Sequence, residues 1–447
     1  MNAAERLDKD YVWHPFTQMR DWLAEPQLVI VAGEGVRLID ADGNMYYDGV
    51  SSLWLNVHGH RKEAIDRAII DQLGRIAHTT MLGLISQPAA ELAAELAAIA
   101  PPGLAKVFYS DSGSTAVEIA VKMAYQYWQL KGVATKRRFV TLANAYHGDT
   151  IGSVSVGGID LFHRIFAPLL FPTVQAPSPS CRHCRLAGDP KRCGMACLAA
   201  MEDILARDHG EIAAVVMEPL VQGAAGMLTH PPGYLKGVRE LTKRYGVLLI
   251  VDEVATGFGR TGRMFACEHE GVSPDIMTVA KGITAGYLPL AATLTTTEVF
   301  EAFLGSHTEQ KTFFHGHSYT GNPLACAAAL ANLRVFREEK VLAGLPAKIA
   351  AAREQLDALR LLAHVGDVRQ CGLMIGIELV QDRAGGVPYP AEAAMGARVC
   401  RHARRYGLII RPLGDVVILM PPLASTAAEI GEMTAIVRRA IDEVTGE

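Results

Sequence analysis

Short apolar runs alternate with amphipathic stretches through the middle of the chain. The apolar runs, four to six residues long, occur at 106–109, 138–142, 213–217, 247–251, 276–280 and 290–295. Segments with helical spacing of apolar residues lie between them, for example 114–131 and 233–245. Strands that alternate with helices form βαβ units, in which helices cover both faces of a mostly parallel sheet. The pattern predicts an α/β fold for this part of the chain.

The pattern changes after about residue 325. A long Ala/Leu-rich helical stretch at 323–360 precedes strand-like segments near 373–380 and 408–420, and a last helix is expected at 426–443. This order of elements predicts a second, smaller α+β domain. We therefore expect a large domain at 61–330 and a small domain at 331–447. Residues 1–60, with strand-like segments at 28–31 and 36–39, are expected to pack with the small domain.

Two strands of the expected sheet each end in one ionisable side chain. Asp252 follows the apolar run 247–251, and Lys281 follows 276–280 and precedes Gly282. Open parallel sheets bind ligands at the carboxyl ends of their strands. A lysine and an acid at that edge are typical of pyridoxal phosphate (PLP) sites: the lysine forms a Schiff base, and the acid pairs with the pyridinium nitrogen. The alternative is a solvated lysine and a turn-capping acid, but a lysine after a buried strand fits that interpretation poorly.

Two further segments fit the same cofactor. The strand at 106–109 runs into a Ser-Asp-Ser-Gly-Ser sequence and then a helix, so Gly113 and Ser114 are candidate phosphate donors at a helix N-terminus. The same cluster could be only a well-capped helix. Tyr146 follows the strand at 138–142 and could stack on a cofactor ring, or it could simply fill a loop.

Bulk composition narrows the class of protein. The chain has 447 residues, half of them hydrophobic, and a net charge of −4 with acids and bases mixed throughout. These values indicate a large core and no basic nucleic-acid face or polybasic membrane patch. The polar N-terminus is unlike a signal peptide, and no apolar run approaches the length of a membrane helix. We expect a cytoplasmic protein with reduced cysteines.

Four of the eight cysteines lie close together in the sequence. Cys181 and Cys184 are followed by Cys193 and Cys197, with His183 between the first pair. Such thiols could hold a tetrahedral zinc, although the spacing of the second pair fits the usual patterns less well. The alternative, a loop with free thiols, is the one we adopt, and we assign no catalytic metal.

Several motifs together resemble the class III aminotransferases. The motifs are SDSGSTAVEIA, AYHGDTIG, MEPLVQGAAGM, VDEVATGFGRTG, AKGITAGYLP and HGHSYTGNPLACAAAL. The resemblance covers essentially the whole chain and implies the fold-type I PLP architecture and a homodimer with shared active sites. It also implies that the segment with Gly316, His317 and Ser318 reaches the phosphate bound by the neighbouring subunit. Ser318 stands where many members carry threonine, and it keeps the hydroxyl.

Other residues are similar to the class III subgroup that converts 8-amino-7-oxononanoate to 7,8-diaminononanoate in biotin synthesis. Ala255 stands where many other members have glutamine, and the WHPFTQM, SSLW and RPLGD runs point the same way. The resemblance implies that Arg411 pairs with the substrate carboxylate, as a guanidinium does in a bidentate fork. A surface arginine is the alternative. Trp54 and Asp149 are expected to line the substrate cleft.

The amino donor is less clearly indicated. Members that use S-adenosylmethionine typically have tyrosine at the position of Phe16 and tryptophan at the position of Leu53. The chain instead resembles the members that use lysine, which we favour while S-adenosylmethionine stays open. Competing activities are a class III ω-aminotransferase that acts on a diamine or ω-amino acid, and a PLP aminomutase or racemase. A non-catalytic interaction protein on the same fold is the remaining alternative.

Overall fold

The large part of the molecule is built on a seven-stranded sheet. The computed structural model describes residues 2–182, 184, 186 and 193–446. Across the sheet, the order of strands is β4 (Leu104–Ser110), β12 (Ala291–Thr296), β11 (Ile276–Val279), β10 (Leu248–Asp252), β7 (Ile212–Met217), β5 (Arg138–Leu142) and β6 (Val174–Ala176). Within this described sheet, β12 alone runs in the direction opposite to the other six strands. The mostly parallel sheet expected from the sequence is therefore confirmed.

Both faces of this sheet are buried, as the apolar strand sequences predict. In β10, Leu249 and Val251 belong to one apolar cluster, whereas Leu248 and Ile250 belong to another. This alternation follows from the two-residue period of a strand, which points successive side chains to opposite faces. Helices cover both sides: α6 (Gly113–Leu130) packs against β7, β11 and β12, and α10 (Tyr234–Arg244) packs against β10.

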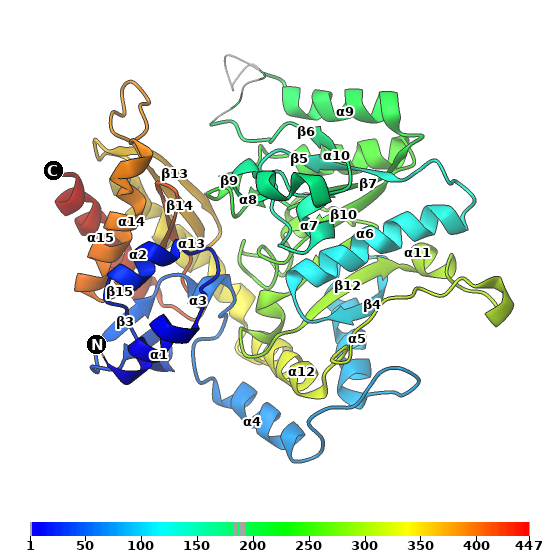
Figure 1. The fold of residues 1–447 in the computed structure, drawn as a ribbon, viewed down its shortest axis with the longest axis horizontal. Coiled ribbons are helices and arrows are strands. Elements are labelled where there is room, and N and C mark those ends of the chain that lie inside the picture. Colours follow the sequence, from blue (N-terminus) through cyan, green and yellow to red (C-terminus); the bar gives the residue numbers. More distant parts are fainter. Residues whose placement is uncertain (1, 183, 185, 187–192, 447) are drawn as a thin grey trace.

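The other helices of the large part surround this sheet (Figure 1). They are α4 (Glu63–Leu73), α5 (Gln87–Ile99), α7 (Ile151–Ser155), α8 (Asp160–His163), α9 (Ala196–Asp208), α11 (Thr297–Glu301) and α12 (Pro323–Glu338). A short hairpin, β8 (Val221–Gln222) with β9 (Leu228–Thr229), lies toward the smaller part. Helix α12 packs against α4, against α5 and against the 3-10 turn Lys281–Thr284.

The smaller part contains a four-stranded sheet and three helices. The sheet order is β13 (Val365–Cys371), β14 (Met374–Leu379), β17 (Val416–Leu419) and β16 (Arg411–Leu413). The helices are α13 (Val341–Leu359), α14 (Met395–Ala403) and α15 (Ala427–Thr445). The long helical stretch expected at 323–360 is thus two helices. It breaks because Glu339 ends α12 and Lys340 adopts a left-handed φ of 50°, which no apolar periodicity could reveal.

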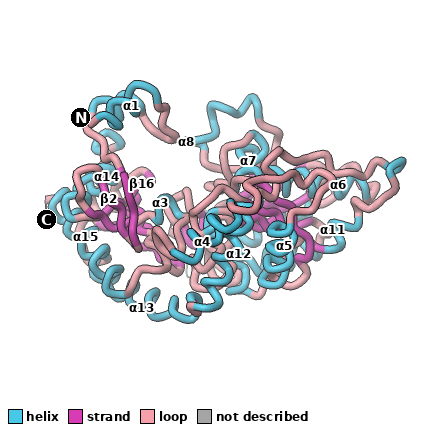
Figure 2. Tube along the Cα trace, turned by 90° about the horizontal axis from the view of Figure 1, so that it is seen from below, coloured by secondary structure: helices cyan, strands magenta, loops and turns pink. Residues whose placement is uncertain are grey.

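The N-terminal segment joins this smaller part through a second sheet. Strands β1 (Ile30–Glu34), β2 (Arg37–Asp40) and β3 (Met45–Asp48) form an antiparallel meander, and β15 (Leu408–Ile409) pairs with β3 in parallel. Helices α1 (Ala3–Tyr11), α2 (Met19–Ala24) and the single turn α3 (Ser51–Trp54) belong to the same segment. Both chain termini lie at this end of the molecule (Figures 1 and 2). The pairing supports our proposal that residues 1–60 pack with the small domain.

No helix in the described part of the chain is long and apolar enough to cross a membrane.

Candidate active site

Lys281 and Asp252 line one cavity at the edge of the large sheet. Asp252 is the last residue of β10, and Lys281 comes two residues after the end of the neighbouring parallel strand β11. The cavity has a volume of about 450 Å³. Its wall also contains Gly113, Ser114, Trp54, Tyr146, Asp149 and Ala255, all singled out from the sequence. Adjacent strands therefore deliver the lysine and the acid to the same pocket, as parallel pairing requires.

Lys281 is held in an unusual local environment. Its φ is 48°, in the left-handed region, and its Nζ lies 5.2 Å from the centroid of the Trp54 ring. Burial lowers its pKa below the ordinary value, although the charges of Asp252 and Glu218 act in the opposite direction. A lowered pKa increases the fraction of neutral amine, which is the nucleophilic form.

The turn that follows Lys281 is tied to α12 by a buried asparagine. The Nδ2 of Asn332 donates to the carbonyl oxygens of Gly282, at 2.9 Å, and Ile283, at 2.8 Å. The Oδ1 of Asn332 lies 2.8 Å from the Nε2 of His58, and both side chains are buried. These bonds satisfy backbone groups that would otherwise be buried without partners, so they fix the backbone beside the lysine.

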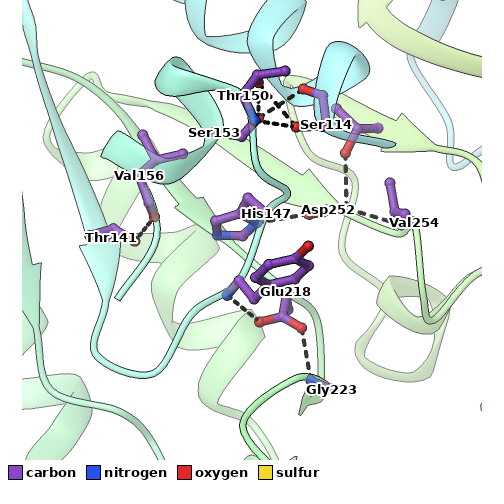
Figure 3. Close-up of polar contacts among 12 residues, drawn as sticks. Ser114, Thr141, His147, Thr150, Ser153, Val156, Glu218, Gly223, Asp252 and Val254 are labelled. Atoms are coloured by element: carbon purple, nitrogen blue, oxygen red, sulfur yellow. Dashed lines mark hydrogen bonds and ion pairs between the residues drawn. The ribbon is translucent and has the colours of Figure 1, made fainter. Parts of the chain in front are cut away.

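Asp252 is buried and receives three hydrogen bonds. The backbone N–H of Val254 and the hydroxyl of Thr278 donate to its Oδ1, at 3.0 and 3.1 Å. The Nδ1 of His147 lies 2.7 Å from its Oδ2 (Figure 3). Since an ionised carboxylate only accepts, His147 donates through Nδ1. Burial lowers the pKa of His147, but the hydrogen bond and the charge of Asp252 outweigh it and leave that pKa raised.

Glu218 is a second buried acid on the cavity wall. It accepts from the backbone N–H of Tyr146, at 3.2 Å, and of Gly223, at 2.8 Å (Figure 3). Burial raises its pKa from 4.5 to about 7, despite the opposing charge of His147. Sequence reasoning assigned no role to His147 or Glu218. The available signal was their place inside the AYHG and MEP motifs, where His147 follows Tyr146 and Glu218 follows the apolar run 213–217.

Aromatic contacts connect Tyr146 with Phe162 and Phe16. The hydroxyl of Tyr146 donates to Asp149 at 2.8 Å, and burial, with a smaller contribution from Asp149, raises the tyrosine pKa. The Phe162 ring makes edge-to-face contacts with Tyr146 at 6.2 Å and with Phe16 at 5.4 Å. Phe16, from the N-terminal segment, is thus linked to the wall of the cavity through Phe162. Phe162 is a residue that the sequence did not single out.

The N-terminus of α6 faces the same cavity. Ser112 caps the helix by accepting from the N–H of Thr115, and the side chain of Ser114 accepts from the N–H groups of Asp149 and Thr150, each at 2.9 Å. The Ser114 hydroxyl therefore anchors the 148–150 loop, and its backbone N–H is the group available for an anion. A Cβ at Gly113 would lie 2.6 Å from a methyl carbon of Val254, so a larger residue would not fit there without a shift.

Several predicted site residues do not lie on the wall of this cavity in the single chain. Leu53 and Phe16 are exposed, and so are Gly316 and Ser318. His317 is partly buried, with its Nε2 3.7 Å from a carboxylate oxygen of Asp111, which does line the cavity. Arg411 begins β16 and is exposed. The roles expected of these residues remain predictions.

The four clustered cysteines lie around one small cavity. Cys181, Cys184, Cys193 and Cys197 line a space of about 100 Å³, and all four thiols are free. Among the described residues, no group of three His, Cys, Asp or Glu side chains is arranged to hold a metal ion. His183 lies outside the described residues. The loop with free thiols remains our interpretation.

The residues present fit PLP. A half-buried lysine and a buried carboxylate line the same cavity, and a helix N-terminus with a tightly packed glycine offers N–H groups to a phosphate. In addition, the second ring nitrogen of His147, Nε2, is buried without a hydrogen-bond partner. The imidazole ring therefore bonds through Nδ1 alone, to the carboxylate of Asp252.

Comparisons with known proteins agree with this chemistry. The model of the family described as Aminotransferase class-III matches residues 19–441. A relative from Geobacter sulfurreducens, named adenosylmethionine-8-amino-7-oxononanoate aminotransferase, is 55% identical over 98% of this chain and 97% of its own length.

Solved structures similar to this chain are also aminotransferases. The crystal structure of a Methanocaldococcus jannaschii protein with the same name has a TM-score of 0.94 at 45% identity, covering 98% of each chain. A Pseudomonas jessenii ω-transaminase in complex with PMP has a TM-score of 0.95 at 31% identity, covering 100% of this chain and 99% of that one. The chain therefore belongs to the class III aminotransferases and is a PLP-dependent transaminase of fold type I.

Proposed function

We propose that this enzyme aminates the ketone of 8-amino-7-oxononanoate to form 7,8-diaminononanoate in biotin biosynthesis. The observation that carries the proposal is the pair of Lys281 and Asp252 on one cavity wall that also contains Ala255 and Trp54. The name of the Geobacter sulfurreducens relative, at 55% identity over nearly the full length, supports the choice of keto substrate.

The residues nearest the proposed cofactor each have a proposed role. PLP, when bound, acts as an electron sink for negative charge that develops on the substrate carbon. Lys281 would hold the cofactor covalently and, once released, move the proton between the substrate carbon and C4′ as general base and acid. Asp252 would keep the pyridine nitrogen protonated, and His147 would hold that carboxylate in place.

The remaining cofactor contacts belong to the ring face and the phosphate. Tyr146 would lie against the ring, and the backbone N–H groups of Gly113 and Ser114 would bind the phosphate. His317 and Ser318, with Gly316 beside them, would complete the phosphate site and substrate cleft of the other subunit of a homodimer.

Exposed apolar side chains support the homodimer. Leu82, Ile85, Leu161, Ile165 and Phe314 are each at least 80% exposed, and a second subunit would cover apolar side chains of this kind. The proposed shared site explains why residues 316–318 are absent from the cavity wall of a single chain. The cytoplasmic location expected from the sequence stays a prediction.

The substrate would be oriented by its two ends. Arg411 would grip the carboxylate through a bidentate fork, and Trp54, Leu53, Phe16 and Asp149 would line the path to Lys281. Arg411 is exposed in the single chain, so a substrate carboxylate would have an accessible partner.

The rival activity is that of an ω-transaminase. Those structures have equally high TM-scores, but the ω-transaminase in complex with PMP is only 31% identical to the chain, against 45% for the Methanocaldococcus jannaschii protein.

The donor remains a choice between lysine and S-adenosylmethionine. The names of the relatives contain adenosylmethionine, which supports that donor for those proteins. In this chain Phe16 lacks a phenolic hydroxyl and Leu53 lacks an indole, and on these grounds we favour lysine. The polarity and shape of the donor pocket would change with both residues.

The test is an amination assay with purified, PLP-loaded enzyme. We expect 7,8-diaminononanoate from 8-amino-7-oxononanoate with lysine, and we compare S-adenosylmethionine and an ω-amino acid at equal concentration. Amination of pyruvate by an ω-amino acid, without use of 8-amino-7-oxononanoate, would overturn the proposal. Lys281→Ala is expected to lose multiple turnover, whereas a matched change at exposed Lys131 should keep it.

A further inference from the structure

The segment that carries Trp54 has a backbone that L-residues avoid. Ser51, Ser52, Leu53 and Trp54 have φ values of 48°, 41°, 72° and 71°, and none of them is glycine. In this left-handed conformation each Cβ approaches the following carbonyl oxygen, so such residues normally occur singly. A run of four is therefore strained, and strain of this kind persists only where the surroundings enforce it.

One buried carboxylate binds the turn directly, in addition to the backbone bonds from Trp54 to Val50 and from Leu55 to Ser51. Asp48, fully buried at the end of β3, accepts from the backbone N–H of Ser52 at 2.7 Å and from its hydroxyl at 2.8 Å. The Nε2 of His60 lies 3.0 Å from the same carboxylate oxygen that receives the hydroxyl. The hydroxyl of Ser51 donates to the carbonyl oxygen of Met420 at 2.6 Å, which attaches the turn to the small domain.

The turn presents Trp54 to the active site. Its indole is buried against Val221, Met227 and Met374, and it lines the main cavity with Lys281. The Nζ of Lys281 lies 5.2 Å from the ring centroid, within the range of a cation–π interaction. A right-handed turn over 51–54 would direct the ring elsewhere, because reversing the hand changes the direction of every Cα–Cβ bond.

We propose that Asp48 is a positioning residue of this transaminase: its carboxylate holds residues 51–54 in the left-handed turn and thereby keeps the Trp54 ring against the nitrogen of Lys281. The inference rests on the proposed attachment of PLP to Lys281. The ring face favours positive charge at that nitrogen, so the turn sets the proton affinity of the site as well as the shape of the substrate cleft.

A pH titration of the visible absorption of the PLP-loaded enzyme tests this role, because that absorption reports the protonation of the Lys281 nitrogen. Asp48→Asn removes one acceptor oxygen from the turn. We expect the titration midpoint to fall by about 0.5 pH unit or more, since a cation–π interaction contributes about that much to proton affinity. The charged groups that act on Lys281, namely Asp252, Glu218 and Arg260, are kept in this variant. Asp48→Asn also removes a charge that acts on Arg260, so Ser52→Ala, which keeps that charge, separates loss of the turn from loss of charge.

Asp40 provides a matched control. It is also a buried aspartate that caps a turn, accepting from the backbone N–H groups of Asp42 and Asn44 and from the hydroxyl of Tyr46, but no residue of that turn lines the cavity. Asp40→Asn should lower the thermal unfolding midpoint as Asp48→Asn does and leave the absorption titration unchanged. Ser52→Ala, which removes one bond to Asp48, should move the titration in the same direction by less.

The outcomes are distinguishable from failure of the proposed function. If wild-type enzyme shows no visible band that depends on Lys281, the attachment of PLP is wrong. If that band is present but either Asp48→Asn or Ser52→Ala titrates like the wild type, or Asp40→Asn shifts the midpoint as much as Asp48→Asn does, the positioning role of Asp48 is wrong. If Asp48→Asn does not fold, the Ser52→Ala titration decides.

Discussion

The Nδ1 of His147 lies 2.7 Å from a carboxylate oxygen of Asp252, and both side chains are buried. The two residues are 105 positions apart in the chain and meet because His147 follows the end of β5 and Asp252 is the last residue of β10. The contact holds the carboxylate of Asp252, the acid proposed to bind the pyridine nitrogen, in place. Among the described residues, it is the only ion pair that involves Asp252.

Replacing His147 should weaken the hold on PLP. A hydrogen bond to a charged group contributes about 1.5–3 kcal/mol, so His147→Ala is expected to lower PLP affinity or turnover by about 10- to 100-fold. Titration of the apoenzyme with PLP measures the change. His147→Asn, which can still donate, should recover part of it. His230→Ala removes another imidazole with buried ring nitrogens and should leave affinity unchanged.

Glu218 predicts a pH dependence of stability. Its folded-state pKa, about 7, lies above its ordinary value of 4.5, so the folded protein binds this proton more tightly than the unfolded chain does. Its contribution to stability is complete below pH 4.5 and is lost as the pH rises toward about 7. Glu218→Gln should therefore lose less thermal stability between pH 5 and pH 8 than the wild type. The same change at exposed Glu392 should have no such effect, and an identical pH profile for Glu218→Gln would contradict the assignment.

Arg411 should act on only one of the two half-reactions. If it grips the substrate carboxylate, Arg411→Ala raises the KM for 8-amino-7-oxononanoate by about 10- to 100-fold, the range expected for charged hydrogen bonds. The apparent KM for the donor should change little. Steady-state kinetics with each substrate varied in turn separates the two effects. Arg398→Ala, at another exposed arginine of the small domain, is the control.

The left-handed turn predicts an inverted order of two substitutions at Leu53. In an ordinary helix alanine is more stabilising than glycine by about 1 kcal/mol. At φ 72° the order should reverse, with Leu53→Gly more stable than Leu53→Ala by about 0.5–1 kcal/mol, because glycine carries no Cβ. Urea unfolding of both variants measures the difference. A less stable glycine variant would mean that the turn is not strained.

The cysteine cluster leads to a simple measurement. We expect purified protein to contain less than one zinc ion per chain, because no described group of three potential ligands is arranged around a metal position. Elemental analysis after gel filtration gives the metal content. Stoichiometric zinc that disappears in a Cys181→Ser and Cys193→Ser double variant would contradict this expectation.

Local sequence patterns were sufficient to predict the strands of the large sheet. Runs of apolar residues predicted β5, β7, β10 and β11 nearly to the residue, because a strand buried on both faces has few polar positions. The same runs located Asp252 and Lys281 at the ends of neighbouring strands. The break between α12 and α13 was not visible, because a single residue with positive φ does not interrupt an apolar period.

The sequence by itself therefore determined the α/β frame, the acid and the lysine, since each follows from periodicity within a few residues. Tertiary structure decided what surrounds them. His147 reaches Asp252, Glu218 becomes buried beside both, and Asp48 holds a left-handed turn that places Trp54 against Lys281. These relationships depend on side chains from segments far apart in the chain, and burial and strain arise only when those segments meet.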